Sequence, residues 1–175
     1  YTKQSDYAQQ PVVGDLCALH DALGGDAALW VGHDWGSPSV WNIASHHPQR
    51  CAGVASLCVP YASLERGLEQ CLAHVDRSIY PEDLYPAGQW EYMRFYEENF
   101  ERATEQFQAN SRNVVQLLFR KGDPEGFGKP SATAFTRIHN GWFGEDGYAP
   151  EMPLDTDVVT AEDIDIYAES LERNG

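Results

Sequence analysis

The chain has 175 residues, with 27 Asp or Glu against 12 Lys or Arg, which gives a formal net charge of −15. This excess of negative charge argues against nucleic acid and against an anionic membrane surface as partners. The length suits a single hydrophobic core, and the sequence shows no signal peptide, transmembrane run, repeat or low-complexity tract. The four cysteines match no metal-binding spacing, so we expect reduced thiols and a cytoplasmic location.

A helix, a strand and a second helix are predicted first. Residues 8–23 form the first helix, which two glycines end. Its apolar positions at helical spacing are Val12, Leu16, Leu19 and Leu23. Residues 27–31 form a short apolar run that is typical of a buried strand. The second helix covers residues 38–46 and has a proline in its first turn.

The segment between this strand and the second helix has the pattern small–x–acid–x–small, Gly32-His33-Asp34-Trp35-Gly36. Gly-x-nucleophile-x-Gly is the form of a sharp strand-to-helix elbow that exposes a nucleophile. Because backbone crowds such a turn, we expect only small residues to fit at Gly32 and Gly36. Asp34 therefore holds the nucleophile position.

Asp34 has two interpretations. A carboxylate is already ionised at neutral pH, so it can attack a saturated carbon without a base. The attack would open an epoxide or expel a halide, and it would leave an ester on the enzyme. The alternative is structural, because an Asp at this position can cap the N-terminus of the following helix.

The rest of the chain changes character at Pro60. Residues 52–59 form a second apolar strand, which completes a parallel strand–helix–strand unit. No further strand is predicted after it. The expected helices cover residues 64–73, 89–110, 113–120 and 160–173. The second of these breaks at Asn99, and the third is apolar nearly all round. The last begins with a capping box at Thr160, has Gly175 at its end and carries an apolar stripe of Ile164, Tyr167 and Leu171. Residues 79–88 and 121–157 are predicted as loops.

The string Val-Gly-His-Asp-Trp-Gly at residues 31–36 resembles the nucleophile elbow of α/β-hydrolase-fold epoxide hydrolases. It resembles more loosely the elbows of haloalkane and fluoroacetate dehalogenases. The resemblance implies an α/β fold class: a partial hydrolase core over residues 1–59 (strand, nucleophile elbow, helix, strand), followed by an α-helical cap, or lid, over residues 60–175. The change at Pro60 falls where this family inserts its cap.

Tyr92-Met93-Arg94-Phe95-Tyr96-Glu97-Glu98 also resembles the cap helix that carries one of the family's two ring-opening tyrosines. By position Tyr92 is that residue, and its phenol would donate a hydrogen bond to the epoxide oxygen. Tyr96, one turn later, is the rival for this role. The alternative for Tyr92 is an aromatic that only packs.

The resemblance also gives Trp35 a role. In this fold the main-chain N–H after the nucleophile donates to the oxyanion while the ester is hydrolysed. The indole of Trp35 would also form a wall of the pocket. An ordinary buried tryptophan is the alternative.

The function implied by the resemblance is hydrolysis of an epoxide to a vicinal diol, a detoxification reaction, by a longer parent protein. The family's catalytic histidine, its acid partner and the second tyrosine have no counterpart here, and His139 in a cap-like loop is not assigned to that role. We therefore expect the 175 residues alone to be inactive. No cofactor or metal is implied. The expected partners are a small epoxide and water, with a homodimer as one assembly to test.

Two other functions stay open. A haloalkane or fluoroacetate dehalogenase would use the same ester on Asp34. A non-catalytic binding module on a hydrolase-like scaffold would use the long loop of residues 121–157 and exposed aromatics.

Overall fold

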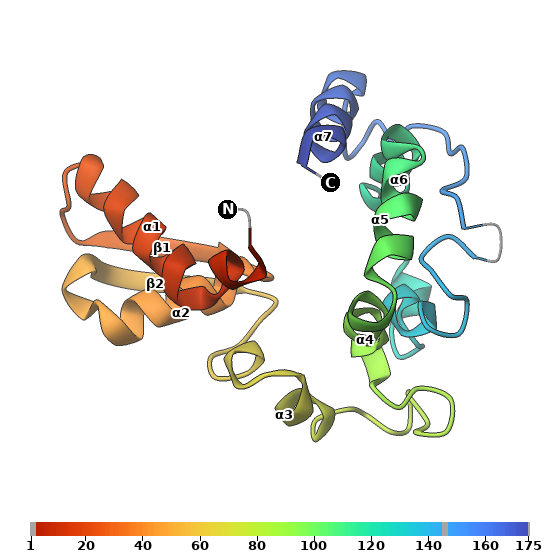
Figure 1. Cartoon of the computed structure of the whole chain (residues 1–175), viewed down its shortest axis with the longest axis horizontal. Helices are drawn as coiled ribbons and strands as arrows, with labels where there is room; N and C mark the ends of the chain where they lie inside the picture. Colours follow the sequence, from red (N-terminus) through yellow and green to blue (C-terminus); the bar gives the residue numbers. More distant parts are fainter. Residues whose placement is uncertain (1–2, 145–146, 175) are drawn as a thin grey trace. The chain divides into compact units, whose positions relative to one another are not determined.

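The computed structural model describes residues 3–144 and 147–174, and its contacts divide the chain into two compact units (Figure 1). The first unit is Tyr1–Ala73 and the second is His74–Gly175. The first contains η1 (Gln4–Tyr7), α1 (Gln9–Ala22), β1 (Ala28–His33), α2 (Gly36–His46), η2 (Pro48–Arg50), β2 (Cys51–Leu57), η3 (Leu64–Arg66) and α3 (Leu68–Leu72), where η marks a 3-10 helix. The second contains η4 (Gly88–Trp90), α4 (Glu91–Glu98), α5 (Phe100–Gln108), α6 (Ser111–Leu118), η5 (Pro124–Gly126), η6 (Ala132–Phe135) and α7 (Ala161–Asn174). The division predicted at residues 59 and 60 rests on the family resemblance and stays a prediction.

The first unit is built on a parallel strand–helix–strand unit, as predicted. β1 pairs with β2 in parallel, with Leu29 opposite Gly53 and His33 opposite Leu57. α2 connects the two strands and packs on both of them and on α1. The buried cluster beneath the helices consists of Val13, Cys17 and Ile43, with Leu16, Trp30 and Cys51 packed against it.

The other face of this sheet is open among the described residues. The side chains of Leu29, Val31 and Leu57 are all more than half exposed. The prediction that residues 27–31 form a buried strand was therefore wrong for this chain, although a strand does form there. The reason is that alternate strand residues point to opposite faces, and α1 and α2 cover only the face that carries Trp30.

The core-facing stripe of α1 also differs from the predicted one. The buried residues are Val13, Cys17 and His20, whereas Leu19 and Leu23 are exposed. A histidine can occupy this stripe because both of its ring nitrogens are hydrogen-bonded. Nε2 donates to the carbonyl of Asp26 (2.7 Å), and Nδ1 accepts from Nη1 of Arg50 (3.0 Å). The spacing of apolar residues does not predict a buried histidine, because it carries no information about these hydrogen-bond partners.

The second unit is helical in its regular structure, and the predicted break at Asn99 is confirmed between α4 and α5. Phe100, the first residue of α5, is exposed although it is a large apolar residue. α6 is apolar nearly all round in sequence, but it is not buried on all sides. Val114 and Val115 are buried, whereas Leu118 is half exposed. The surrounding elements cover only one side of α6, and this explains the difference.

α7 follows the sequence prediction closely. Thr160 and Asp163 form the capping box: the amide of Thr160 donates to the Asp163 carboxylate (2.9 Å), and the amide of Asp163 donates to the Thr160 hydroxyl (3.1 Å). Ile164 is buried in a cluster that Leu171 packs against. Tyr167 instead lies at the surface, where its ring stacks on Phe119 at 4.8 Å.

The expected loops and the third predicted helix complete the fold. The predicted helix of residues 64–73 is divided into η3 and α3, and residues 121–157 hold only the short η5 and η6 among the described residues. Residues 145–146 of that loop and Gly175 lie outside the described residues. The four cysteines form no disulfide with one another. Over the described ranges, the chain contains no helix that is both long and apolar enough to cross a membrane.

Candidate active site

The predicted nucleophile Asp34 lies at the turn between β1 and α2. Its backbone has a φ of 50°, in the left-handed region that residues with a side chain rarely adopt. The main chain holds it on both sides: the amide of Asp34 donates to the carbonyl of Leu57 (3.1 Å), and its carbonyl accepts from the amide of Ser37 (2.9 Å). This is the sharp strand-to-helix turn that the motif predicted.

The two glycines of the motif have different environments. A Cβ atom on Gly32 would lie 2.5 Å from the carbonyl oxygen of Gly36 and 2.8 Å from Cγ2 of Val40. This confirms the expectation of a small residue at Gly32, where there is no room even for a methyl group. A Cβ on Gly36 would meet no described atom within 4 Å outside its neighbours and its own helix backbone, so this crowding is confined to Gly32. The turn is crowded because the carbonyl of Gly36 points at Gly32.

Ser37 supports the elbow and was not singled out from the sequence. Its side chain is fully buried, and its hydroxyl lies 3.1 Å from the carbonyl oxygen of Gly32 and 3.2 Å from that of Leu57. The hydroxyl thus ties the first turn of α2 to the ends of both strands. A small hydroxyl residue directly after the motif is the only sequence signal of this contact.

Around this turn the Asp34 side chain and Trp35 face solvent. Asp34 is exposed, and its carboxylate makes no hydrogen bond or ion pair with any described residue. α2 begins at the N-cap Trp35 without a side-chain capping bond. Trp35 is 50% exposed, so it is not an ordinary buried tryptophan in this chain, and no described residue accepts a hydrogen bond from its main-chain N–H.

In the second unit, Tyr92 and Tyr96 form an aromatic triangle with Trp142. The two tyrosine rings meet edge to face at 5.9 Å, and the indole lies 6.0 Å from the Tyr92 ring and 6.3 Å from the Tyr96 ring. Burial raises the pKa of the Tyr96 phenol above its ordinary value of 10.0, and the neighbouring indole of Trp142 offsets only part of that rise. The Tyr96 phenol therefore remains protonated at neutral pH and can donate a hydrogen bond.

A buried carboxylate fixes the helix that carries both tyrosines. Glu91 is 1% exposed, accepts from the amide of Ala87 (2.5 Å) and pairs with Nη1 of Arg137 (3.0 Å). Arg137 also makes two parallel hydrogen bonds to Glu98, and these carboxylates raise the pKa of its guanidinium. Arg137 thus binds a carboxylate at each end of α4, and no pattern in the sequence indicates that these two distant segments meet.

The predicted site residues thus fall into two groups. Asp34 and Trp35 lie next to each other in the first unit, and Tyr92 and Tyr96 lie next to each other in the second. His139 is exposed and stacks on Phe135 at 5.5 Å, so the structure gives it no other role. In the described parts of the chain, no group of three or more His, Cys, Asp or Glu side chains could hold a metal ion.

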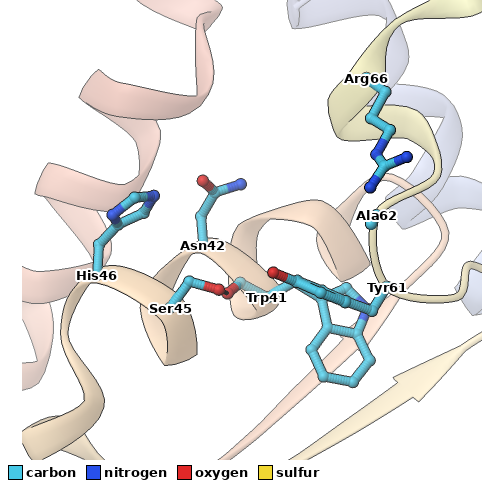
Figure 2. Close-up of a pocket in the computed structure, with 7 residues that line it drawn as sticks. All are labelled: Trp41, Asn42, Ser45, His46, Tyr61, Ala62 and Arg66. Carbon is cyan, nitrogen blue, oxygen red and sulfur yellow. Dashed lines mark hydrogen bonds between the residues drawn. The ribbon is translucent and has the colours of Figure 1, made fainter.

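A separate cavity of about 290 Å³ lies beside α2 (Figure 2). It is lined by Trp41, Asn42, Ser45 and His46 of α2 and by Tyr61, Ala62 and Arg66 of the following segment. The rings of Trp41 and Tyr61 meet at 5.4 Å and form its apolar wall. Asp34 is not among its lining residues, so this cavity is not the predicted nucleophile pocket.

Comparison with known proteins supplies the family. Residues 2–162 match the model of the alpha/beta hydrolase fold. The chain is 45% identical to epoxide hydrolase B of Mycobacterium tuberculosis over 62 residues. This match covers 35% of this chain and 17% of that protein. Over 171 residues it is 27% identical to bifunctional epoxide hydrolase 2 of Mus musculus, which covers 97% of this chain and 28% of that protein.

Solved structures give the same result. The chain is similar to epoxide hydrolase A from Mycobacterium thermoresistibile, with a TM-score of 0.65 and 25% identity over 99% of this chain and 50% of that one. It is also similar to an epoxide hydrolase from Vigna radiata, with a TM-score of 0.59 and 26% identity over 97% of this chain and 47% of that one.

The chain spans less than a third of the length of these curated relatives and about half the length of these solved ones. The predicted α/β fold class and the resemblance to epoxide hydrolases are confirmed by these matches and by the parallel strand–helix–strand unit followed by helices. The chain belongs to the alpha/beta hydrolase fold family.

Proposed function

We propose that the full-length protein carrying this chain is an epoxide hydrolase, with Asp34 as its nucleophile and Tyr92 as the hydrogen-bond donor to the epoxide oxygen. The observation that carries the proposal is the elbow. A carboxylate with no partner among the described residues stands at a turn whose backbone has a φ of 50°. The names of the relatives point to epoxides as the substrate class.

The first step follows from the chemistry of a carboxylate. One oxygen of Asp34 attacks a ring carbon of the epoxide, the bond from that carbon to the ring oxygen breaks, and an ester forms. The ring oxygen becomes an alkoxide, which takes a hydrogen bond and then a proton from the Tyr92 phenol. The Asp34 carboxylate accepts no hydrogen bond from the described first turn of α2, which supports this role for Asp34 over helix capping.

The second step is hydrolysis of the ester. Water adds to the ester carbonyl of Asp34, and the main-chain N–H of Trp35 would donate to the oxyanion that forms. Collapse of the intermediate breaks the bond from the ester carbon to the substrate oxygen, which takes one of the water's protons and leaves as the vicinal diol. The other proton of the water returns to the Tyr92 phenolate, so the carboxylate and the phenol are both regenerated. Water needs a general base in this step, and we assign none in this chain. The 175 residues alone are therefore expected to release no diol.

The two parts of the chain would serve these steps differently. We assign residues 1–59 to the hydrolase core that presents Asp34, and residues 60–175 to the α-helical cap that presents Tyr92. The helical character of the second unit and the clamp of Glu91 on α4 support the second assignment. The substrate is a small epoxide, water is the co-substrate, and the cytoplasmic location stays a prediction.

The test is diol release by the full-length protein from a simple epoxide such as styrene oxide. The wild-type protein is expected to release the glycol, and the Tyr92→Phe variant is expected to slow its formation by about 100-fold or more, because a general acid typically contributes about 10²- to 10⁴-fold. Tyr96→Phe is the matched control. If Tyr96→Phe gives the larger loss, the donor is Tyr96 and not Tyr92.

The alternatives give other outcomes. A haloalkane or fluoroacetate dehalogenase would release halide and leave styrene oxide unchanged. A non-catalytic module would do neither. Each of these results would overturn the proposal.

A further inference from the structure

The aromatic triangle of Tyr92, Tyr96 and Trp142 depends on a loop residue that comes from far along the chain. Trp142 follows η6, whereas both tyrosines lie on α4. Ring contacts at 6.0 and 6.3 Å set where the tyrosine rings lie. A residue that fixes Trp142 therefore also fixes the rings of Tyr92 and Tyr96.

One buried amide holds the turn before Trp142. Gln106 of α5 is 4% exposed, although glutamine is rarely buried without hydrogen-bond partners. Its Oε1 accepts from the main-chain N–H of Trp142 (3.3 Å), and its Nε2 donates to the carbonyl of Asn140 (3.3 Å). The same carbonyl accepts from Nε of Arg102 (2.7 Å). The amide thus bridges both sides of Gly141.

Gly141 shows how closely this amide is fitted. Its φ is +150°, and a Cβ atom there would lie only 2.2 Å from Nε2 and 2.3 Å from Oε1 of Gln106. Its own N–H donates to the carbonyl of Thr136 (2.8 Å) and closes the turn. The glutamine amide therefore packs directly on the bare backbone of Gly141, and it cannot shift without losing its two hydrogen bonds.

We propose that Gln106 is a positioning residue for epoxide opening: it fixes Trp142, and Trp142 fixes the phenols of Tyr92 and Tyr96. The inference rests on the proposed function of this site. A misplacement of the phenol by a fraction of an ångström weakens the hydrogen bond to the developing alkoxide, so it slows ester formation. Hydrolysis of the ester uses other groups and should not change.

The experiment compares Gln106→Met with Gln108→Met in the full-length protein. Both glutamines lie on α5, and Gln108 is exposed. Rapid mixing with styrene oxide, followed by intact mass, gives the rate at which the adduct appears and the rate at which it decays. Gln106→Met is expected to slow adduct formation about tenfold with unchanged decay, and Gln108→Met is expected to change neither rate.

A second readout needs no activity. Isotope-labelled tyrosine, followed by NMR with Tyr96→Phe for assignment, reports the titration of the Tyr96 phenol. Because burial raises this pKa and the Trp142 indole lowers it, displacement of Trp142 in Gln106→Met should shift the Tyr96 pKa from its wild-type value, and Gln108→Met should leave it unchanged. A Tyr96 titration that does not move in Gln106→Met overturns the inference even if the protein opens no epoxide.

The remaining outcomes are also decisive. A wild-type protein that forms no adduct defeats the proposed function and leaves the tyrosine titration to decide the contact. If folded Gln106→Met forms the adduct at the wild-type rate, the positioning role of Gln106 is overturned and the proposed function still stands. If Gln106→Met does not fold, Trp142→Phe keeps the N–H that Gln106 binds and removes the indole. Adduct formation at the wild-type rate in that variant would equally overturn the inference.

Discussion

The two units hold their predicted reactive groups by different means. In the first, the main chain positions Asp34: two backbone hydrogen bonds and the close approach of Gly32 to Gly36 define the turn. In the second, side chains from separate segments position Tyr92: Trp142 lies against its ring, and Glu91 with Arg137 fixes its helix. A site made by backbone is recognisable in a short motif, whereas a site made by distant side chains is not.

The largest effect is expected where the second unit depends on a buried charge. Arg137→Met leaves the carboxylate of Glu91 buried without its cation. The free energy of unfolding should fall by about 2 to 3 kcal/mol, at the low end for a broken buried pair because Arg137 is itself 35% exposed. Urea unfolding of the full-length protein measures it. Arg94→Met, which removes an i,i+3 surface pair with Glu97, should cost about 0.5 kcal/mol or less; equal losses would contradict the distinction.

Backbone crowding in the first unit gives the next effect. Gly32→Ala places a methyl group 2.5 Å from the carbonyl of Gly36, so we expect a loss of about 1 to 3 kcal/mol in stability and slower ester formation. Gly36→Ala is the control, because its Cβ meets no described atom. It should be neutral or stabilising by up to about 1 kcal/mol at the first turn of a helix. If both alanines cost the same, the elbow is not set by this contact.

A local device in the second unit should give a smaller effect. Thr160→Ala removes the hydroxyl that caps α7 and should cost about 1 kcal/mol in the free energy of unfolding. Thr104→Ala is a matched control, because its hydroxyl only donates to the carbonyl one turn earlier in α5. Chemical denaturation compares the two variants. If Thr160→Ala lowers the free energy of unfolding no more than Thr104→Ala does, the cap does not stabilise α7 and tertiary packing alone holds it.

The smallest effect is a dependence on pH in the first unit. A hydrogen bond from Arg50 holds the pKa of the Asp21 carboxyl below its ordinary value of 3.8. The stabilisation is therefore fully present above about pH 4, and it is lost as the pH falls through the lower pKa of the folded state. The difference in urea midpoint between wild type and Asp21→Asn should shrink between about pH 6 and about pH 3. If the difference in urea midpoint stays constant over this range, the Asp21–Arg50 pair is not the source of the stability difference.

The same contrast explains what the sequence could predict. The parallel strand–helix–strand unit, the turn at Asp34, the break at Asn99 and the capping box at Thr160 are local patterns, and each was confirmed. Burial was harder to predict, because Leu29 and Val31 lie on a face that no described element covers.

Long-range side-chain contacts were beyond the sequence altogether. The amide of Gln106 meets a turn 34 residues away, and Arg137 meets Glu91 46 residues away. Nothing in the spacing of polar residues marks such pairs. The choice between Tyr92 and Tyr96 belongs to the same class, because it depends on how each phenol is held and not on its position in a motif.

The central claim is that Asp34 forms the ester, and intact mass spectrometry after brief mixing of the full-length protein with styrene oxide tests it most directly. The account predicts a transient mass increase of one epoxide, mapped by proteolysis to Asp34, with glycol appearing as the adduct decays. Asp34→Asn should show no adduct in the same interval. Glycol formed without an adduct on Asp34, or an adduct that persists in Asp34→Asn, would contradict the account.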